Sequence, residues 1–308
     1  MPSNQSPLGA LPGRFRRQRV LVVGCGDVGL RLAAGLAGRA RLLALTSSPQ
    51  RVAELRARGI TPLQGNLDVP ASLARLAGLA DRVVHLAPPA AEGAPQWWRD
   101  LRTQALLRAL ARRSPPRALV YASTSGVYGD CAGELVPETR AVRPHTPRAQ
   151  RRVDAERQLR AFGLRHQVRT NTLRIPGIYA PDRAGGTPRG RLLKGTPVLR
   201  AEEDVYTNHI HADDLARALR AALWRGRPQR AYNTSDDSEL KMGDYFDLAA
   251  DLYGLPRPPR VTRGAAQEQL PLVVLSFMGE SRRLVNERMK RELRVRLRYP
   301  TVEEGLRG

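Results

Sequence analysis

Cysteine, aromatic residues and long apolar runs are all scarce in this 308-residue chain. The two cysteines, Cys25 and Cys131, supply neither a disulfide framework nor the ligand spacing of a metal site, so we expect no metal. No apolar run approaches the ~20 residues of a membrane-spanning helix, so we expect no membrane partner. The first seven residues also lack the apolar core of a secretory signal. We therefore expect residues 1–18 to form a disordered tail on a cytoplasmic protein.

Lysine is rare as well, whereas arginine is in large excess. Lysine and arginine together number 51 against 29 acidic residues, which gives a net charge of +22. Such a charge is typical of nucleic-acid-binding proteins. Here, however, the arginines are spread through every predicted helix, and aromatic residues make up only 5% of the chain. We interpret the excess as a compositional bias, and we expect attraction of anionic dinucleotides and phosphorylated substrates but no specific nucleic-acid partner.

Strand and helix patterns alternate through more than half of the chain. Short apolar runs predict strands, and longer amphipathic segments between them predict helices. Strands separated by helices form right-handed βαβ units, which build a parallel sheet that is covered on both faces. The predicted strands are residues 20–23, 42–45, 60–63, 83–86, 118–122, 167–174 and 231–233, and the predicted helices are residues 30–38, 49–58, 71–79, 101–112, 148–162 and 213–224. The fold class is therefore α/β, a Rossmann-type doubly wound parallel sheet.

The regular alternation loosens after Tyr179. Residues 181–190 are rich in glycine, proline and arginine, which predicts a mobile loop, and the chain from Lys241 onward is helical with proline-rich breaks. We expect two domains. A dinucleotide-binding domain would comprise residues 19–180 and 205–237, and a smaller, mostly helical lobe that covers the substrate would comprise residues 181–204 and 238–308.

A glycine motif follows the first predicted strand and opens the first predicted helix. Residues 24–29 read Gly-Cys-Gly-Asp-Val-Gly. The first glycine permits a tight turn, the second lets the backbone approach a pyrophosphate, and the third allows close packing of helix on strand. The free N–H groups of the helix N-terminus attract the phosphates. This predicts a dinucleotide site that includes Gly24, Gly26, Asp27, Val28 and Gly29.

The end of the second predicted strand indicates which dinucleotide is bound. An acidic residue there would hold the adenosine ribose of NAD, but residues 45–51 contain no carboxylate. Thr46, Ser47 and Ser48 offer hydroxyl groups, and Arg51 can pair with a 2′-phosphate. The segment favours NADP over NAD, with an ordinary polar loop as the alternative interpretation.

Further motifs make the chain resemble the extended short-chain dehydrogenase/reductase superfamily, specifically its NAD-dependent epimerase/dehydratase group. The matching segments, in order, are Gly-Asn-Leu-Asp at 65–68, Val-Val-His-Leu-Ala at 83–87, Ala-Ser-Thr-Ser-Gly-Val-Tyr-Gly at 122–129, Leu-Arg-Ile-Pro-Gly-Ile-Tyr-Ala-Pro at 173–181 and Asn-His-Ile-His-Ala-Asp-Asp at 208–214. The resemblance implies that Asn66 and Leu67 lie at the adenine ring and that Leu86 and Ala87 pass the cofactor. It also implies hydride transfer to or from a small-molecule substrate.

The catalytic pair of that family is missing. Its members use Tyr-x-x-x-Lys on the helix after the Ser/Thr motif, where the tyrosine exchanges a proton and the lysine holds the nicotinamide ribose and lowers the tyrosine pKa. Aligning Glu156 with the family's usual glutamate places Arg148 at the tyrosine position and Arg152 at the lysine position. No lysine precedes Lys194, so the pair cannot exist in the first domain. Arg152 can still hydrogen-bond a ribose, but a guanidinium like that of Arg148 cannot shuttle protons near neutrality.

Two hydroxyl groups remain as candidates for catalysis. The resemblance implies that Thr124 hydrogen-bonds a substrate oxygen, whereas the residue pattern alone is equally typical of a satisfied hydroxyl at a strand end. Tyr128 is the nearest remaining phenol and a candidate substitute acid, although the equivalent tyrosine of the family mainly shapes the pocket.

Two histidines and two aspartates surround the start of the helix predicted at 213–224. A metal site would need a third ligand that cannot be placed, so we interpret His209 and His211 as packing or hydrogen-bonding residues. Asp213 and Asp214 are interpreted as N-terminal caps of this helix.

Two hypotheses about function remain open. The first is an atypical NAD(P)-dependent oxidoreductase or epimerase-like enzyme that acts on a small hydroxyl or carbonyl substrate, such as a nucleotide-sugar. The second is a catalytically inactive dinucleotide-binding protein, acting as a redox sensor or assembly factor. The missing pair favours the second, and the neighbourhood of Thr124 and Tyr128 favours the first. The sequence leaves the oligomeric state open and allows a homodimer.

Overall fold

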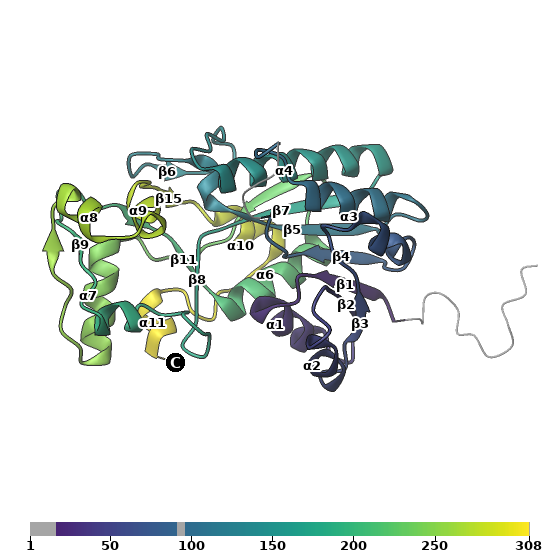
Figure 1. Ribbon diagram of the computed structural model, residues 1–308, viewed down its shortest axis with the longest axis horizontal. Helices are drawn as coiled ribbons and strands as arrows, with labels where there is room; N and C mark the ends of the chain where they lie inside the picture. Colours follow the sequence, from purple (N-terminus) through teal and green to yellow (C-terminus); the bar gives the residue numbers. More distant parts are fainter. Residues whose placement is uncertain (1–16, 91–95, 308) are drawn as a thin grey trace, which may run out of the picture.

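The centre of the molecule is a parallel sheet of seven strands, seen in a computed structural model that describes residues 17–90 and 96–307 (Figure 1). The strand order is β12-β7-β5-β4-β1-β2-β3, and every neighbouring pair is parallel. These strands are β1 (Arg19–Val23), β2 (Arg41–Thr46), β3 (Thr61–Gln64), β4 (Arg82–His85), β5 (Ala118–Thr124), β7 (Arg169–Ile175) and β12 (Arg230–Asn233). The predicted Rossmann-type α/β class is confirmed.

The strand order reverses at β1. The chain first builds outward from β1 through β2 to β3, and then returns to place β4 on the other side of β1. From there it continues through β5 and β7 to β12. The connections after β1 and β4 lead to helices on opposite faces of the sheet, and ligands bind beside the carboxyl ends of the strands at such a reversal.

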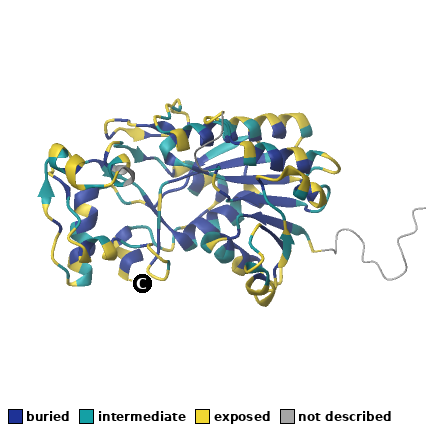
Figure 2. Ribbon diagram, in the orientation of Figure 1, coloured by how far each residue is buried: buried dark blue, intermediate teal, exposed yellow. Residues whose placement is uncertain are grey.

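Helices cover both faces of the sheet. One face carries α1 (Asp27–Leu36), α6 (Ala212–Arg225) and α10 (Glu287–Leu293), and the other carries the 3-10 helix η2 (Pro70–Leu76), α3 (Leu101–Ala111) and α4 (Pro147–His166). Alternate residues of β1 point to the two faces, so that Val20 and Val22 join the first core while Leu21 and Val23 join the second. The sheet is the most deeply buried part of the molecule (Figure 2).

A third core lies apart from the sheet, in a lobe drawn at the left of Figure 1. Its apolar residues come mainly from α7 (Met242–Tyr253), α8 (Arg263–Gln269), α9 (Leu272–Met278) and α11 (Val302–Arg307). The other elements are α2 (Arg51–Ala57), α5 (Arg189–Leu193), the 3-10 helix η3 (Ser125–Tyr128), β6 (Leu135–Val136), β8 (Gly177–Tyr179), β9 (Val198–Leu199), β10 (Tyr206–Thr207), β11 (His209–His211), β13 (Leu240–Lys241), β14 (Arg260–Val261) and β15 (Arg283–Leu284). The lobe is smaller and mostly helical, as predicted.

Several boundaries differ from those predicted. The first helix begins at Asp27, inside the glycine motif, because the turn leads directly into it. The segment predicted as a helix at 71–79 is the 3-10 helix η2, whose Ser72 hydroxyl bonds the carbonyl of Val69 at 2.7 Å and so competes with regular helical bonding. The predicted tail, 1–18, lies outside the described residues except for its last two. The domain bounds stay a prediction, although α10 packs on the sheet core and not in the lobe.

The residues before and at the start of α6 are arranged differently from the prediction. The side chain of His211, and not an aspartate, caps the helix by accepting a hydrogen bond from the Asp213 N–H at 3.2 Å. Asp214 is fully buried and instead accepts hydrogen bonds from the backbone N–H groups of Arg298 and Tyr299, so its interpretation as a cap was wrong. The local order of residues could not reveal that a segment more than 80 positions away supplies its partners.

His209 is a packing residue, as interpreted from the sequence. Its ring lies 4.2 Å from that of Tyr245 between centroids and is buried. Across the described ranges, 17–90 and 96–307, no group of three His, Cys, Asp or Glu side chains could hold a metal ion. Within the same ranges, no helix is long and apolar enough to cross a membrane.

The buried ring of His209 predicts a dependence of stability on pH. Burial lowers the pKa of His209 from 6.5 to about 4. Between these two pH values the ring stays unprotonated in the folded protein but takes up a proton in the unfolded chain. The stabilising contribution is therefore complete above pH 6.5 and is lost as the pH falls toward 4, by about 1.4 kcal/mol per pH unit. His209→Phe keeps an aromatic ring and removes the proton. Between pH 7 and 5 the wild type should lose about 2 kcal/mol more free energy of unfolding than the variant, as measured by urea denaturation. If the free energy of unfolding falls equally in the wild type and the variant, His209 is not the source of the pH dependence.

Candidate dinucleotide and substrate site

The glycine turn lies at the point where the strand order reverses. Gly24 has a φ of +84°, and a Cβ atom at this position would lie 2.5 Å from the backbone nitrogen of Ala87, so only glycine fits. A Cβ on Gly29 would lie 3.3 Å from Val22, which reflects the close packing of α1 on β1. A Cβ on Gly26 would meet no atom within 4 Å. The first and third glycines thus serve packing, while the second faces open space.

The N-terminus of α1 opens onto this space. Gly26 is the N-cap residue and has no side chain to satisfy the first N–H groups, which leaves them free for an anion. Asp27, in the first turn, would repel that anion, but its carboxylate is paired with Arg31 at 3.1 Å and with Arg183 at 3.5 Å. Cys25 points into the core, and burial raises the pKa of its thiol to about 11, so it is a packing residue.

A pocket of about 260 Å³ begins at this turn and extends along the carboxyl ends of the strands. It is lined by the glycine motif, by residues at the ends of β4, β5 and β7, by α4 and α6, and by Arg183. In chain order, the lining residues are Gly24, Gly26, Asp27, Val28, Gly29, Leu86, Ala122, Ser123, Thr124, Arg148, Arg152, Ile175, Pro176, Ile178, Arg183 and Leu215. All members of the predicted glycine set, together with Leu86, Thr124, Arg148 and Arg152, therefore meet at one site.

The other predicted cofactor residues lie outside this pocket. Thr46 and Ser48 bond each other through the Ser48 N–H and the Thr46 hydroxyl oxygen at 3.2 Å, and Ser47 beside them is exposed. Arg51 pairs with Glu54 at 3.3 Å and remains partly exposed, and its charge reaches the Cys25 thiol beside the glycine turn. These residues form the end of β2 and the start of α2, next to β1, where a 2′-phosphate is predicted.

Asn66, Leu67 and Ala87 each have a structural role in addition to the predicted one. The Asn66 side chain accepts a hydrogen bond from the Asp68 N–H at 2.9 Å, and Leu67 is buried in the second core. Ala87 supports Gly24 from the loop after β4. The predicted contact of Asn66 and Leu67 with adenine remains a prediction.

Thr124 presents its hydroxyl group at the end of β5. Its Oγ1 atom accepts a hydrogen bond from the Gly126 N–H at 3.3 Å and caps η3. Because that bond uses only an acceptor site, the O–H of this half-buried residue remains available to donate to a ligand in the pocket. The preceding Ser123 is committed elsewhere, because its hydroxyl donates to Glu156 at 2.6 Å.

Arg148 and Arg152 lie one turn apart on α4 and both line the pocket. Arg152 is buried and is held by hydrogen bonds to the carbonyl of Ala122 and, at 3.1 Å, to the hydroxyl of Tyr121, while its Nε has no partner among the described residues. Arg148 has no hydrogen bond or ion pair with any described side chain. Partial loss of hydration and the nearby charge of Arg152 lower the pKa of Arg148. Two guanidinium groups side by side can attract a negatively charged oxygen, but they cannot exchange a proton near neutrality.

Tyr128 is not among the residues that line the pocket, and its burial argues against the predicted role as a substitute acid. It is 1% exposed, donates to Asn233 Oδ1 at 2.7 Å and accepts from Arg174 Nη1 at 2.9 Å. Burial, only partly opposed by the charge of Arg174, raises the pKa of Tyr128 to about 12. Arg174 in turn pairs with Glu156 at 2.8 Å. The phenol thus belongs to a buried network that ties η3 and α4 to β7 and β12.

Sequence reasoning missed several lining residues. Arg183 is the most informative, since it brings a third guanidinium to the pocket and neutralises Asp27. Its only signal was its place in the arginine-containing segment 181–190. Ile175, Pro176, Ile178 and Leu215 form an apolar wall, and the first three belong to the recognised segment 173–181.

Comparison with known proteins gives a family match and several structural matches. The model of the NAD-dependent epimerase/dehydratase family matches residues 20–235, which span the sheet and all the glycine and strand-end motifs. A comparison with curated proteins gives no match.

The structural matches extend over nearly the whole chain. A protein from Silicibacter pomeroyi described as functionally unknown is 30% identical, with a TM-score of 0.76 and coverage of 94% of this chain and 97% of that chain. UDP-glucose 4-epimerase from Thermotoga maritima with UDP-glucose is 19% identical (TM-score 0.76), and MoeE5 in complex with UDP-glucose and NAD is 24% identical (TM-score 0.73). Each of these two covers 94% of this chain and 96% of its own. At such identities the last two show a shared fold.

The open space at Gly26 predicts a variant that folds but binds dinucleotide poorly. In Gly26→Ala the new methyl group meets no protein atom, and the backbone φ of −81° suits alanine. The same methyl group stands where a pyrophosphate must approach the backbone, so we expect at least tenfold weaker NADPH and NADH binding, measured by nicotinamide fluorescence. The melting temperature should not change.

Gly264→Ala is the matched control. It adds a methyl group to an equally open position on α8, away from the pocket, and should leave dinucleotide binding unchanged. Unimpaired binding by Gly26→Ala would show that the dinucleotide does not lie on this turn.

Proposed function

Because the chain belongs to the NAD-dependent epimerase/dehydratase family, we propose that it is an atypical NAD(P)-dependent oxidoreductase or epimerase. Its substrate is a small molecule with a hydroxyl or carbonyl group. The observation that carries the proposal is a single pocket in which the glycine turn, the Thr124 hydroxyl and the guanidinium groups of Arg148 and Arg152 meet. The proposal is supported because the groups that would bind the dinucleotide and the substrate line the same pocket.

The pocket fits a dinucleotide. Gly26 leaves open space at the helix N-terminus, the loop after β4 lies against the turn, and no unpaired carboxylate faces the phosphate position. A bound nicotinamide dinucleotide would supply hydride transfer to or from a substrate carbon. Arg152, whose side chain lines the pocket, would hold the nicotinamide ribose in place of the usual lysine.

NADP is the preferred cofactor of the proposal. Support comes from the absence of any carboxylate at 45–51 and from Arg51, whose guanidinium is partly exposed at the start of α2. NAD remains the alternative, since the structurally similar MoeE5 is described in complex with NAD.

The substrate oxygen would lie between the Thr124 hydroxyl and Arg148. Thr124 donates a hydrogen bond to that oxygen, and the positive charge of Arg148 stabilises negative charge as it develops there. Neither group has to change its protonation state, so the proton passes to or from water. Proximity of several arginines favours a substrate that carries phosphate or carboxylate groups, and the UDP-sugars named for the structurally similar enzymes have this chemistry.

A second candidate function is an inactive dinucleotide-binding protein, a redox sensor or assembly factor. One observation favours it: among the described residues that line the pocket there is no tyrosine, lysine or histidine, and the one carboxylate is ion-paired. Substrate-dependent turnover separates the two candidates.

The cofactor preference is tested at Arg51. Arg51→Ala should raise the dissociation constant of NADPH about tenfold or more and leave that of NADH within twofold, because only NADPH carries the 2′-phosphate. Arg56→Ala is the control, because it removes the same charge from the same short helix at an exposed position that contacts no described side chain through a hydrogen bond or ion pair. If Arg51→Ala and Arg56→Ala lose equal affinity for NADPH, the effect of Arg51 is one of general charge. If Arg51→Ala loses equal affinity for NADPH and NADH, Arg51 has no role specific to the 2′-phosphate.

The roles of the two hydroxyl groups are tested by turnover. UDP-sugars and small carbonyl compounds are screened with NAD(P)H absorbance and product analysis. On any substrate found, Thr124→Val should lower kcat about 100-fold, because it removes the donor to the reacting oxygen. Tyr128→Phe should keep kcat within a few-fold and instead cost about 1–3 kcal/mol of stability, because Asn233 and Arg174 lose a buried partner.

A large loss of kcat in Tyr128→Phe with little loss in Thr124→Val would instead indicate that Tyr128 is the acid. Tight dinucleotide binding without turnover on any compound would favour the inactive alternative.

A further inference from the structure

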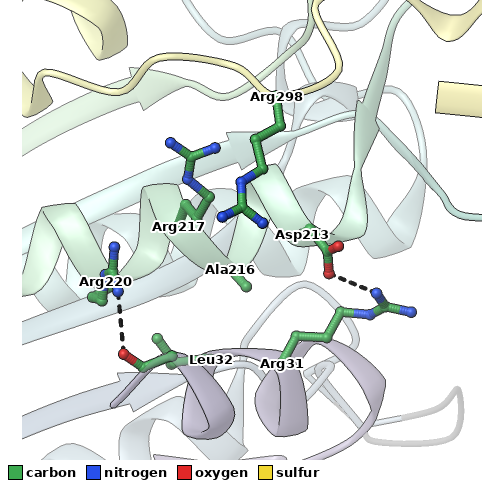
Figure 3. A pocket seen from close by; sticks show the side chains of 8 residues that line it. Arg31, Leu32, Asp213, Ala216, Arg217, Arg220 and Arg298 are labelled. Carbon is green, nitrogen blue, oxygen red and sulfur yellow. Dashed lines mark hydrogen bonds and ion pairs between the residues drawn. The ribbon is translucent and has the colours of Figure 1, made fainter. Parts of the chain in front are cut away.

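A second pocket, of about 250 Å³, lies in the seam between α1 and α6 (Figure 3). Leu32 of α1 and Ala216 of α6 form its apolar part, and four arginines surround it. These are Arg31, Arg217, Arg220 and Arg298. The volume far exceeds the ~10–15 Å³ that a single water needs, so the pocket can admit a multi-atom ligand.

Two of these arginines are already neutralised. Arg31 pairs with Asp213 at 2.6 Å, with Asp182 at 2.6 Å and with Asp27 at 3.1 Å. Arg217 pairs with the buried Asp214 at 3.2 Å. Asp213, the one carboxylate that lines the pocket, is therefore occupied by Arg31.

The other two arginines carry uncompensated charge. Arg220 donates to the backbone carbonyl of Gly35 at 3.1 Å and has no carboxylate partner among the described residues. The guanidinium of Arg298 makes no hydrogen bond or ion pair with any described residue. Loss of hydration lowers the pKa of Arg220, and the charges of Arg39, Arg217, Arg225 and Arg298 lower it further, which shows that like charges gather around this pocket.

The fold holds these arginines in place although they repel one another. Arg217 and Arg220 lie one turn apart on α6. Arg298 comes from a distant segment, and its backbone N–H is fixed by the Asp214 carboxylate at 2.8 Å, as is that of Tyr299 at 2.9 Å. A buried aspartate thus fixes the backbone from which the Arg298 side chain extends to line the pocket.

The pocket is separate from the dinucleotide site. Along α1, Asp27, Val28 and Gly29 line the first pocket, whereas Arg31, Leu32 and Gly35 line the second. The ion pairs of Arg31 with Asp27 and Asp182 lie between the two.

We propose that the pocket between α1 and α6 binds a phosphate-bearing small anion, with Arg220 and Arg298 as its principal ligands. Guanidinium groups that converge on one space without a carboxylate match the several oxygens of a pyrophosphate or a phosphate ester. This site is independent of the function proposed above.

Pyrophosphate, in low salt with a chelator and in the presence of NADPH, is the probe for a calorimetric titration of the full chain. The wild type should bind it, and Arg298→Gln and Arg220→Gln should each weaken binding at least tenfold. Arg108→Gln removes an equal charge from the exposed side of α3, on the opposite face of the sheet, and should bind within twofold of the wild type.

Melting temperatures show whether a variant that binds pyrophosphate weakly is still folded. Since the Arg298 side chain has no partner among the described residues, Arg298→Gln should melt no lower than the wild type without ligand. The variant should, however, lose the rise in melting temperature that pyrophosphate gives the wild type. ADP in place of pyrophosphate shows whether the phosphate is preferred free or on a nucleoside. Wild-type affinity in Arg298→Gln, or equal weakening in Arg108→Gln, overturns the proposal.

Discussion

The close approach of the Gly24 backbone to that of Ala87 is the contact on which the site depends. It brings the loop after β1 against the loop after β4, at the place where the sheet changes direction. A side chain on Gly24 would force these loops apart, and α1 could then not begin directly at the carboxyl end of β1. The helix N-terminus and the open space at Gly26 depend on this contact, and both lie in one pocket with the strand ends up to Thr124.

The many arginines occur in two kinds of surroundings. Some arginines are built into buried or partly buried pairs, as Arg174 is with Glu156 and Arg31 is with three aspartates. Others converge without carboxylates, at Arg148 and Arg152 in the first pocket and at Arg220 and Arg298 in the second. Isolated surface pairs add little stability, whereas uncompensated clusters in a concave site attract anions. The positive charge is therefore expected to attract anions mainly at the two pockets, where the fold brings arginines together without carboxylates.

The residues of the first pocket differ from the family pattern, since arginines stand at the positions expected for the tyrosine and the lysine. The one phenol near the expected position, Tyr128, is used to join Asn233 and Arg174 inside the protein. The Tyr128 hydroxyl uses both its hydrogen and its oxygen in these bonds, and burial raises its pKa. It is therefore poorly suited to exchange a proton with a substrate in the pocket. In the proposed function, Thr124 and Arg148 orient and polarise an oxygen, and the proton comes from water.

The sequence by itself determined the fold class, the position of the glycine turn and the absence of the Tyr-x-x-x-Lys pair. These depend on local periodicity, on the backbone freedom of glycine and on residue types, all of which can be read along the chain. Leu86, Thr124, Arg148 and Arg152, which the family resemblance pointed to, line the same pocket as the glycine motif, and their roles there stay predictions.

Only the tertiary structure decided what surrounds each of these groups. It buried Tyr128, used Asp214 to anchor residues 298 and 299, brought Arg183 to the pocket and gathered Arg220 with Arg298. Each of these contacts joins segments tens to hundreds of residues apart, and the direction of a side chain at such a contact depends on how helices pack on the sheet. Local sequence patterns carry no information about that packing, and so the partners of these side chains could not be read from the sequence.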